Sequence, residues 1–415
     1  MERTNRSLSS RSQLLFLIFV AGLLRFAACW YWFDKLDKDP DGYRALAQMV
    51  ADGKGYSNAF TGRSTAFRPP LYPLLLSGLL KAGGGNGAIA VMQVLLGTLT
   101  VWLASLIALR LQLRLWWLAG LIVAFDPLSL AYTPRVMTEV CSSLTLALVL
   151  LLVQWWSLRD RKLLASAITG VAFGLAALCR PTIWAVLPVM CVFRLRDAIG
   201  GVDKFRRALP QLACFALGVV LLVAPWIWRN IRALDAPVFA TTHGGYTLLL
   251  SNNPEFYNTV ARAEWGTVWD SVPWQKTLKQ RMVDEGIDLT NERTKDRWHY
   301  RLAIRNMRAD PTGAGLSAWL KFRRLWSPTP QLGSQSGVIL WGLRCFYGCL
   351  FVLAAIGCLR RFTWSRPVLQ LSVAMVLAFS AVHLLYWSNA RMRTPLVPAI
   401  GLLAAAACGR IRTDE

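Results

Sequence analysis

"LLFLIFVAGLLRFAACWYWF", residues 14–33, is the stretch that decides the fold class. Every residue in it except Arg25 is apolar or small, and at the helical rise it extends about 30 Å, the thickness of a bilayer's hydrocarbon core. Basic residues precede it, as they do in a signal peptide. The run is long, however, and it ends in a bulky aromatic cluster instead of a small-residue cleavage site. We therefore expect a retained membrane-spanning helix.

The rest of the chain continues this pattern. Of its 415 residues, 55% are hydrophobic and 19 are Trp, which is too apolar for an ordinary soluble protein. Further apolar runs lie at 88–109, 115–133, 138–158, 163–179, 181–195, 208–228, 337–358, 368–387 and 395–409. These runs predict an all-α polytopic membrane protein with about ten transmembrane helices.

The basic residues predict the orientation. A formal net charge of +23 could suggest a nucleic-acid partner, but the Lys and Arg residues are scattered among short connections between spans. When the spans alternate, the connections at 159–162, 194–207, 359–366 and 409–412 fall on the side of the N-terminus. The positive-inside rule makes that side cytoplasmic, in an inner (plasma) membrane. We expect membrane lipids as partners and no nucleic acid.

Three parts follow from this threading: an N-terminal module (1–228) whose first loop covers 34–87, an insertion (229–336), and C-terminal helices (337–415). The first loop, the junction at 134–139, Arg180, the insertion and the segment at 386–393 share the extracytoplasmic face. In the first loop, apolar spacing after Asp41 predicts a short helix with this residue at its N-cap. The stretch from Pro69 predicts a juxtamembrane helix lying along the interface.

Two further features of the sequence carry structural expectations. Helical spacing from Glu292 to Trp326 predicts that the insertion is a partly ordered cap, with a solvated spacer as the alternative. Arg25 and Asp126 lie at similar depth in two spans, and because lone charges in lipid are costly, we expect them to pair. The nine cysteines lie mostly in apolar runs and predict neither a disulfide framework nor a metal site.

Several motifs recur in a familiar order. "DGYRALA" at 41–47, "GKGY" at 53–56 and "RPPLYP" at 68–73 resemble the first extracytoplasmic loop of GT-C superfamily glycosyltransferases. The resemblance is to the branch of the protein O-mannosyltransferases and the lipid A aminoarabinose transferase. Stretches beginning at Met137, Gly170, Pro225 and Ala390 are similar to the same branch. The resemblance therefore extends over essentially the whole chain.

The resemblance implies a transferase that moves a sugar from a polyprenyl-phosphate carrier to an extracytoplasmic glycan, lipid or protein. Asp41 matches the loop carboxylate, implied to be the base that deprotonates or orients the acceptor hydroxyl. Arg68 matches a basic residue implied to hold the donor phosphate, and Glu139 matches a second carboxylate. Relatives often have Asp-Glu where this chain has Asp41 and Gly42, so this chain has no second carboxylate next to Asp41.

The chemistry suits these residue types. A carboxylate that accepts the hydroxyl proton contributes on the order of a hundredfold or more to the rate, and a guanidinium binds phosphate bidentately. The substrate-binding candidates are Arg68, Tyr72, Glu139, Arg229, His243 and Arg391, with His243 lining an acceptor cleft. Each has a plainer alternative: a helix cap for Asp41 and Glu139, a lipid or helix-end contact for the arginines and for Arg180, and a bond within its own turn for His243.

Two questions stay open at this point. Asp41 and Glu139 could share a divalent cation, but the spacing does not decide this, and no other cofactor is expected. The competing functions are a flippase or transporter of lipid-linked sugars and a non-catalytic assembly protein. A transporter would favour internal repeats with broken helices, and we find no convincing repeat.

Overall fold

The computed structural model describes residues 2–157, 162–198, 202–329 and 336–410. Within these ranges the regular elements are helices, and two isolated bridges, Ser57 with Ser64 and Leu113 with Arg410, are the only β-type pairs. The predicted all-α class is confirmed. Parts of the basic connections used to predict orientation, at 159–161, 199–201 and 411–412, lie outside the described residues, as do residues 330–335 of the insertion.

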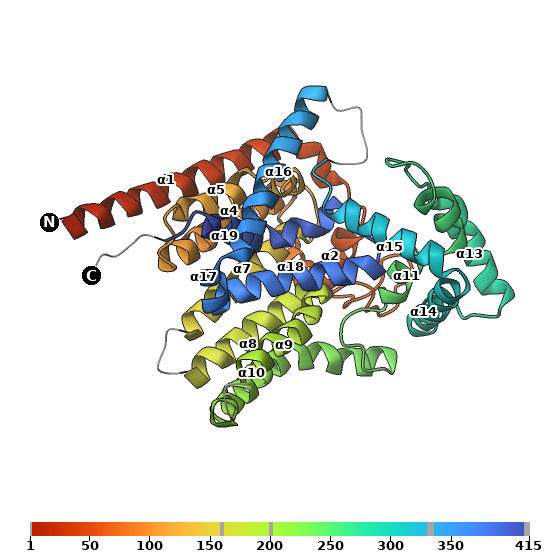
Figure 1. Ribbon diagram of the computed structural model, residues 1–415. Coiled ribbons are helices and arrows are strands. Elements are labelled where there is room, and N and C mark those ends of the chain that lie inside the picture. The colour runs from red at the N-terminus through yellow and green to blue at the C-terminus, as the bar shows by residue number, and fades with distance from the viewer. Residues whose placement is uncertain (1, 158–161, 199–201, 330–335, 411–415) are drawn as a thin grey trace.

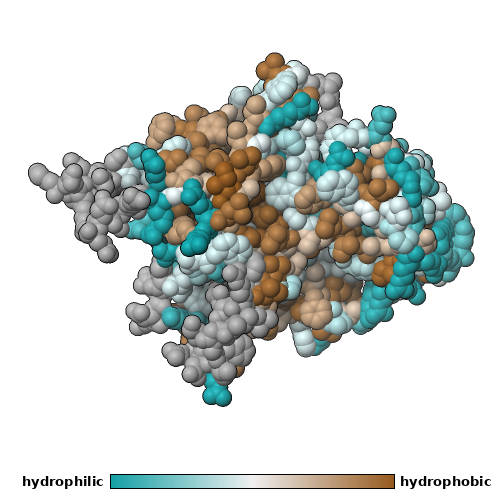
Figure 2. Space-filling view, in the orientation of Figure 1, coloured by the Kyte–Doolittle hydropathy of each residue, from teal (hydrophilic) through white to brown (hydrophobic). Residues whose placement is uncertain are grey.

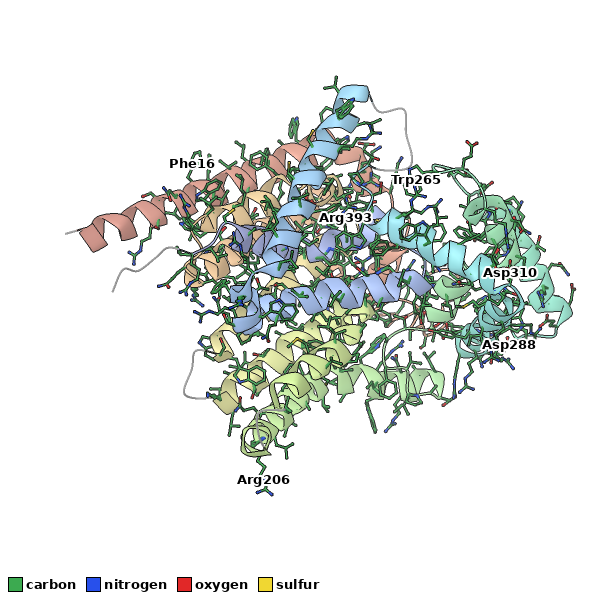
Figure 3. All side chains as sticks on the ribbon, viewed as in Figure 1. Phe16, Arg206, Trp265, Asp288, Asp310 and Arg393 are labelled. Carbon is green, nitrogen blue, oxygen red and sulfur yellow. The ribbon has the colours of Figure 1, made fainter. Side chains whose placement is uncertain are left out.

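Seven helices of the described ranges are long and apolar enough to cross a membrane. They are α1 (Glu2–Tyr31), α4 (Asn86–Arg110), α7 (Glu139–Ser157), α8 (Lys162–Cys179), α10 (Val202–Leu234), α16 (Gly337–Leu359) and α18 (Pro367–Leu385). Phe16 on α1 projects away from the bundle and is 69% exposed (Figure 3), as expected of a side chain that faces lipid. The chain is a multi-pass membrane protein.

The three remaining apolar runs form shorter helices. They are α5 (Trp116–Phe125) with α6 (Pro127–Tyr132), η2 (Pro181–Ala185) with α9 (Val186–Ala198), and η4 (Ala390–Leu396) with α19 (Val397–Ala407). The breaks fall at or near Pro127, Pro181 and Pro395, because proline lacks the N–H that a continuous helix needs. The total of ten crossings therefore stays a prediction.

Close helix packing holds the bundle together. A Cβ atom on Gly170 would collide with the backbone carbonyl oxygen of Phe215, and one on Gly218 would collide with that of Ala167. The backbones of α8 and α10 therefore approach each other directly, as small residues allow in membrane helices. This contact places the last turns of α10, where the insertion begins, beside the end of α8.

The molecule has two distinct ends (Figure 1). Both termini lie at one end of the bundle, and the insertion helices lie at the other. An apolar band crosses the middle of the bundle, and hydrophilic side chains cover the insertion (Figure 2). The insertion helices include α11 (Gly244–Leu249), α13 (Val272–Asp284), α14 (Glu292–Ala309) and α15 (Pro311–Leu325).

The insertion is a folded unit. Leu248, Trp274, Leu278, Trp298 and Leu302 form part of a buried apolar cluster between α11, α13 and α14. The predicted helical tract from Glu292 is present, although it breaks at Asp310, whose side chain caps α15. An apolar core of its own distinguishes the insertion from a solvated spacer.

The first loop contains η1 (Phe33–Asp37), α2 (Tyr43–Ala51) and α3 (Leu71–Lys81), so both predicted short helices are present. The predicted cap is wrong. Asp39 Oδ2, and not Asp41, accepts the backbone N–H of Ala45, at 2.9 Å. Gly42 has a φ of 73°, which glycine adopts at little cost. This turn directs Asp41 away from the start of α2.

The predicted pairing of Arg25 with Asp126 is also wrong. Arg25 donates to the carbonyl oxygens of Val123 at 2.9 Å and Ala124 at 3.5 Å. Asp126 accepts from the backbone N–H of Ser129 at 2.7 Å and from the Tyr347 hydroxyl at 3.0 Å. Because α5 ends at this point, its last carbonyls need donors and take the guanidinium, while Asp126 caps α6.

Candidate active site

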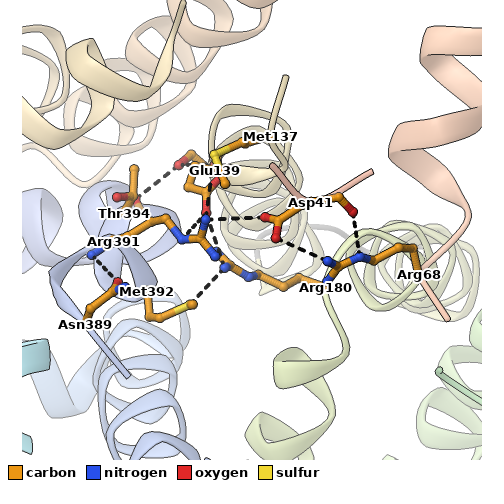
Figure 4. A network of polar contacts seen from close by, with 10 residues as sticks. Asp41, Arg68, Met137, Glu139, Arg180, Asn389, Arg391, Met392 and Thr394 are labelled. Atoms are coloured by element: carbon orange, nitrogen blue, oxygen red, sulfur yellow. Dashed lines mark hydrogen bonds and ion pairs between the residues drawn. The ribbon is translucent and has the colours of Figure 1, made fainter. Parts of the chain in front are cut away.

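Five charged side chains form one alternating chain of ion pairs at the end of the bundle that carries the insertion (Figure 4). Arg68 Nη2 lies 3.1 Å from Asp41 Oδ1, and Arg391 Nη1 lies 3.3 Å from Asp41 Oδ2. Arg391 Nε also lies 3.3 Å from Glu139 Oε1, which is 3.4 Å from Arg180 Nη2. We call these five residues the charge network.

Each member of the charge network lies at a helix boundary. Asp41 precedes α2, Arg68 precedes α3, Glu139 is the first residue of α7, Arg180 separates α8 from η2, and Arg391 lies in η4. Segments from the first loop to the C-terminal helices therefore meet at one point. The predicted convergence of the polar segments holds for these five residues.

The charge network is partly buried and carries an excess of positive charge, because three guanidinium groups face two carboxylates. The Glu139 side chain is only 2% exposed, and the Asp41 side chain is 23% exposed. Glu139 Oε2 and Arg180 Nη1 are buried without a hydrogen-bond partner. Three cations around two carboxylates attract an anion, and Arg180 Nη1 is a buried donor available to contact it.

Aromatic rings support Arg68. Its guanidinium carbon lies 5.3 Å from the ring centre of Tyr43 and 5.2 Å from that of Phe67. Arg68 Nε also donates to the backbone carbonyl of Asp41 at 2.9 Å. Burial raises the pKa of Tyr43, so this hydroxyl stays protonated beside the network. The geometry holds the cation against Asp41 through two bonds and two rings.

Tyr72 lies behind the charge network. Its side chain is fully buried, its hydroxyl accepts from Gln93 Nε2 at 2.9 Å, and its ring packs edge-on against Tyr43 at 5.5 Å between centroids. Tyr72 therefore supports Tyr43. Because the Tyr72 side chain is fully buried, the structure does not favour the predicted contact with substrate.

Arg229 is not part of the charge network. It donates to the carbonyl oxygens of Tyr56 at 2.5 Å and Thr65 at 2.6 Å, and to Asn230 Oδ1 at 3.0 Å. Its guanidinium therefore fastens the first loop to the end of α10. The predicted contact with donor phosphate would require these bonds to break.

His243 lies next to Arg68 by way of Phe67. The rings of His243 and Phe67 are 4.2 Å apart between centroids, and Nδ1 of His243 is buried without a hydrogen-bond partner. Burial, with a further contribution from Arg68, lowers the pKa of His243 well below its usual value. The ring is therefore neutral near pH 7, and its unpartnered nitrogen argues against a bond within its own turn.

The two carboxylates do not fit a shared divalent cation. Arg391 already bridges Asp41 and Glu139, so a metal ion there would replace one guanidinium and lie beside two others. Such ions need several oxygen ligands. No group of three or more His, Cys, Asp or Glu suited to a metal occurs in the parts of the chain that the structure describes.

Sequence reasoning gave two residues too little weight. Arg180 is not among the substrate-binding candidates predicted from the sequence, yet its position just before Pro181 marks a helix boundary. Glu292 was noted only as the start of a helix, but its carboxylate bonds to Thr65, Ala66 and Thr242. No local pattern predicts that contact, because it joins segments more than 200 residues apart.

Comparisons with known proteins agree with the fold. The family model of dolichyl-phosphate-mannose-protein mannosyltransferases matches residues 67–228, a range that includes Arg68, Glu139 and Arg180 but not Asp41 or Arg391. A search of curated protein sequences finds no match. The family model thus covers less than half of the chain.

Solved structures extend the match. The oligosaccharyltransferase AglB from the archaeon Archaeoglobus fulgidus, in complex with an inhibitory peptide and a dolichol-phosphate, aligns with 97% of this chain at 14% identity and a TM-score of 0.56. The chain spans 50% of the length of that protein. ArnT from Cupriavidus metallidurans aligns with 97% of this chain and 78% of its own at 15% identity, with a TM-score of 0.42. The expected resemblance to the GT-C superfamily is confirmed at the level of the fold.

Proposed function

We propose that this protein is a membrane glycosyltransferase that moves a sugar from a polyprenyl-phosphate donor to an acceptor hydroxyl. The observation that carries the proposal is the position of Asp41 between Arg68 and Arg391. The shared fold with a transferase bound to dolichol-phosphate, and the mannosyltransferase family model, support it. A carboxylate enclosed by cations near an apolar bundle suits a substrate with a phosphate and a lipid tail.

The reaction assigns a role to Asp41 and to the three arginines of the charge network. The acceptor hydroxyl oxygen attacks the anomeric carbon of the sugar, and its proton passes to a carboxylate oxygen of Asp41. The bond between that carbon and the phosphate oxygen breaks, and its electron pair leaves with the polyprenyl phosphate. Arg68 and Arg391, assisted by Arg180, stabilise the charge that develops on the phosphate.

Both oxygens of Asp41 contact guanidinium groups, so the opening of one ion pair would make room for the acceptor hydroxyl. Binding of the donor phosphate would open one of these ion pairs. The phosphate competes with Asp41 for Arg68 and Arg391, so donor binding frees an oxygen for the acceptor. His243 is neutral and packs against Phe67, and in this proposal it belongs to the acceptor side of the site.

All three parts of the chain contribute to the proposed active site. The N-terminal module (1–228) supplies Asp41, Arg68 and Glu139, the insertion (229–336) covers the site, and the C-terminal helices (337–415) supply Arg391. The scattered basic connections favour a cytoplasmic N-terminus in an inner membrane, with the site facing outward. The acceptor is then an extracytoplasmic glycan, lipid or protein.

The proposal is tested by supplying the purified protein with a panel of polyprenyl-phosphate sugars and an acceptor mixture from the cell envelope. Release of carrier phosphate, together with sugar on the acceptor, is the expected result. Movement of the intact lipid-linked sugar across vesicles without release would favour a flippase. Neither release nor movement with any donor would favour an assembly protein.

A further inference from the structure

The backbone just before Arg68 is held by a carboxylate of the insertion. Glu292, in the first turn of α14, accepts the Thr65 hydroxyl at 2.5 Å through Oε1. Its Oε2 accepts the backbone N–H of Ala66 at 3.1 Å and the Thr242 hydroxyl at 2.8 Å. Both oxygens of Glu292 are therefore committed to the first loop and the start of the insertion.

These contacts differ from helix capping, which is the usual role of an acidic residue at the start of a helix. The side chain of Asn291 already caps α14, accepting the backbone N–H of Thr294 at 3.1 Å. Glu292 points instead toward a loop that lies more than 200 residues earlier in the sequence. Hydrogen bonds to a charged acceptor are about twice as strong as neutral ones, so this is a firm attachment.

Thr65 is held from two sides by opposite charges. Its hydroxyl donates to Glu292, and its carbonyl oxygen accepts from Arg229 Nη1 at 2.6 Å. Thr65 is 2% exposed, and the neighbouring Ala66 carbonyl accepts the backbone N–H of Thr242 at 3.0 Å. The backbone at 65–66 therefore has little freedom to shift.

The restraint reaches Arg68 within three residues. The backbone N–H of Phe67 donates to Thr65 Oγ1 at 3.0 Å, and the Phe67 ring packs on His243. The Tyr56 hydroxyl lies 2.9 Å from the carbonyl oxygen of Arg68, to which it donates. A shift of the backbone at Thr65 would therefore move the guanidinium that contacts Asp41.

We propose that Glu292 is a positioning residue of the donor-phosphate site, through which the insertion sets the place of Arg68. This inference rests on the proposed function. In this inference the insertion covers the site and also positions Arg68, because the Glu292 carboxylate joins α14, Thr242 and the segment that carries Arg68. Glu292 acts through Arg68 and does not contact the phosphate.

The test is a double-mutant cycle with undecaprenyl phosphate as the probe, measured as Kd on the full-length protein in detergent. The variants are Glu292→Gln, Arg68→Gln and the double variant, with Glu285→Gln as the matched control. Glu285 lies in the same insertion and bonds to Trp298 and Arg281, away from the first loop. Because Glu292 acts through Arg68, its effect disappears once the guanidinium is gone.

We expect Arg68→Gln to weaken binding tenfold or more, Glu292→Gln to weaken it severalfold, and the double variant to bind like Arg68→Gln alone. Glu285→Gln should bind like the wild type. Thr65→Val, which removes one donor to Glu292, should weaken binding and Thr65→Ser should not, which keeps the test decisive if Glu292→Gln folds poorly.

The outcomes that overturn the inference are distinct. Wild-type binding by both Glu292→Gln and Thr65→Val, or losses that multiply in the double variant, would remove the positioning role and leave the donor site intact. Wild-type binding by Arg68→Gln would instead remove the proposed donor site, and the role of Glu292 with it.

Discussion

The molecule handles its buried charges in two different ways. In the bundle, Arg25 donates to backbone carbonyls at the end of α5, and Asp126 accepts from a backbone N–H and the Tyr347 hydroxyl. In the charge network, by contrast, the carboxylates of Asp41 and Glu139 contact guanidinium groups of other segments. The first arrangement uses hydrogen bonds to backbone groups and a hydroxyl, whereas the second uses ion pairs between side chains, for which a phosphate can compete.

We interpret the charges of Arg25 and Asp126 as structural, and those of the charge network as available to a substrate. Arg25 and Asp126 are 1% and 0% exposed, and the hydrogen bonds of both go to groups of the bundle itself, although Arg25 Nε has no partner. The charge network is less deeply buried except at Glu139, and its charged groups contact one another. A site that must admit an anionic substrate needs partners that a phosphate can displace.

The largest effect should come from Asp41→Asn. Removing the base should lower sugar transfer on the order of a hundredfold or more, with little change in melting temperature in detergent. Asp39→Ala is the matched control, because it removes the cap of α2 two residues away. It should cost about 1 kcal/mol in stability and retain transfer. Full transfer by Asp41→Asn would contradict the role of the charge network.

Arg25→Leu should show the reverse pattern. It leaves buried carbonyls at the end of α5 without a donor, which costs about 2–3 kcal/mol in the free energy of unfolding. Transfer per folded molecule should stay at the wild-type level. The measurement is detergent unfolding alongside a transfer assay normalised to folded protein. A selective loss of transfer with unchanged stability would place Arg25 in the chemistry instead.

Tyr347→Phe tests the hydrogen bonds of Asp126 with a smaller change. It removes the hydroxyl that donates to Asp126 Oδ2 and accepts the backbone N–H of Leu128 at 3.2 Å. A loss of about 1–2 kcal/mol in unfolding free energy is expected, because two buried polar groups lose a partner. Phe351→Leu, a neighbouring apolar change that touches neither group, serves as the control for altered packing. Equal transfer rates per folded molecule in both variants would keep the two uses of charge separate.

The smallest effect concerns pH and belongs to the insertion. Burial lowers the pKa of His299 from 6.5 to about 4. Between these values the unfolded chain binds more protons than the folded one, so stability is full above pH 6.5 and falls as the pH drops toward 4. From pH 7 to pH 5.5 the expected loss is about 1 kcal/mol. Tryptophan fluorescence during unfolding measures it.

His299→Gln should flatten this dependence, because the replacement does not titrate. The same slope in both proteins would show that another group is responsible. Burial also lowers the pKa of His243, which adds to the slope in the same direction, so the difference between the two proteins isolates the part due to His299.

The sequence predicts what depends on composition and short spacing. Apolar runs located the spans, and amphipathic spacing located α2 and the helices from Glu292. The order of the motifs identified Asp41, Arg68, Glu139 and Arg391 as candidate site residues. Alternate threading then placed these residues on one face, and the structure brings them within ion-pair distance of one another.

What the sequence could not predict depends on local turns and distant contacts. Asp39 and Asp41 both precede α2, and only the left-handed turn at Gly42 decides which one caps it. Arg25 and Asp126 matched in depth, but depth does not reveal that α5 ends at Asp126 with free carbonyls. Glu292 bonds a loop that only the fold brings near.

The account is tested most directly by a structure determined with undecaprenyl phosphate bound. Phosphate oxygens should lie within hydrogen-bond distance of Arg68 and Arg391, and at least one oxygen of Asp41 should have lost its guanidinium partner. A phosphate bound elsewhere, with Arg68 and Arg391 still on Asp41, would contradict the proposal that this charge network is the active site.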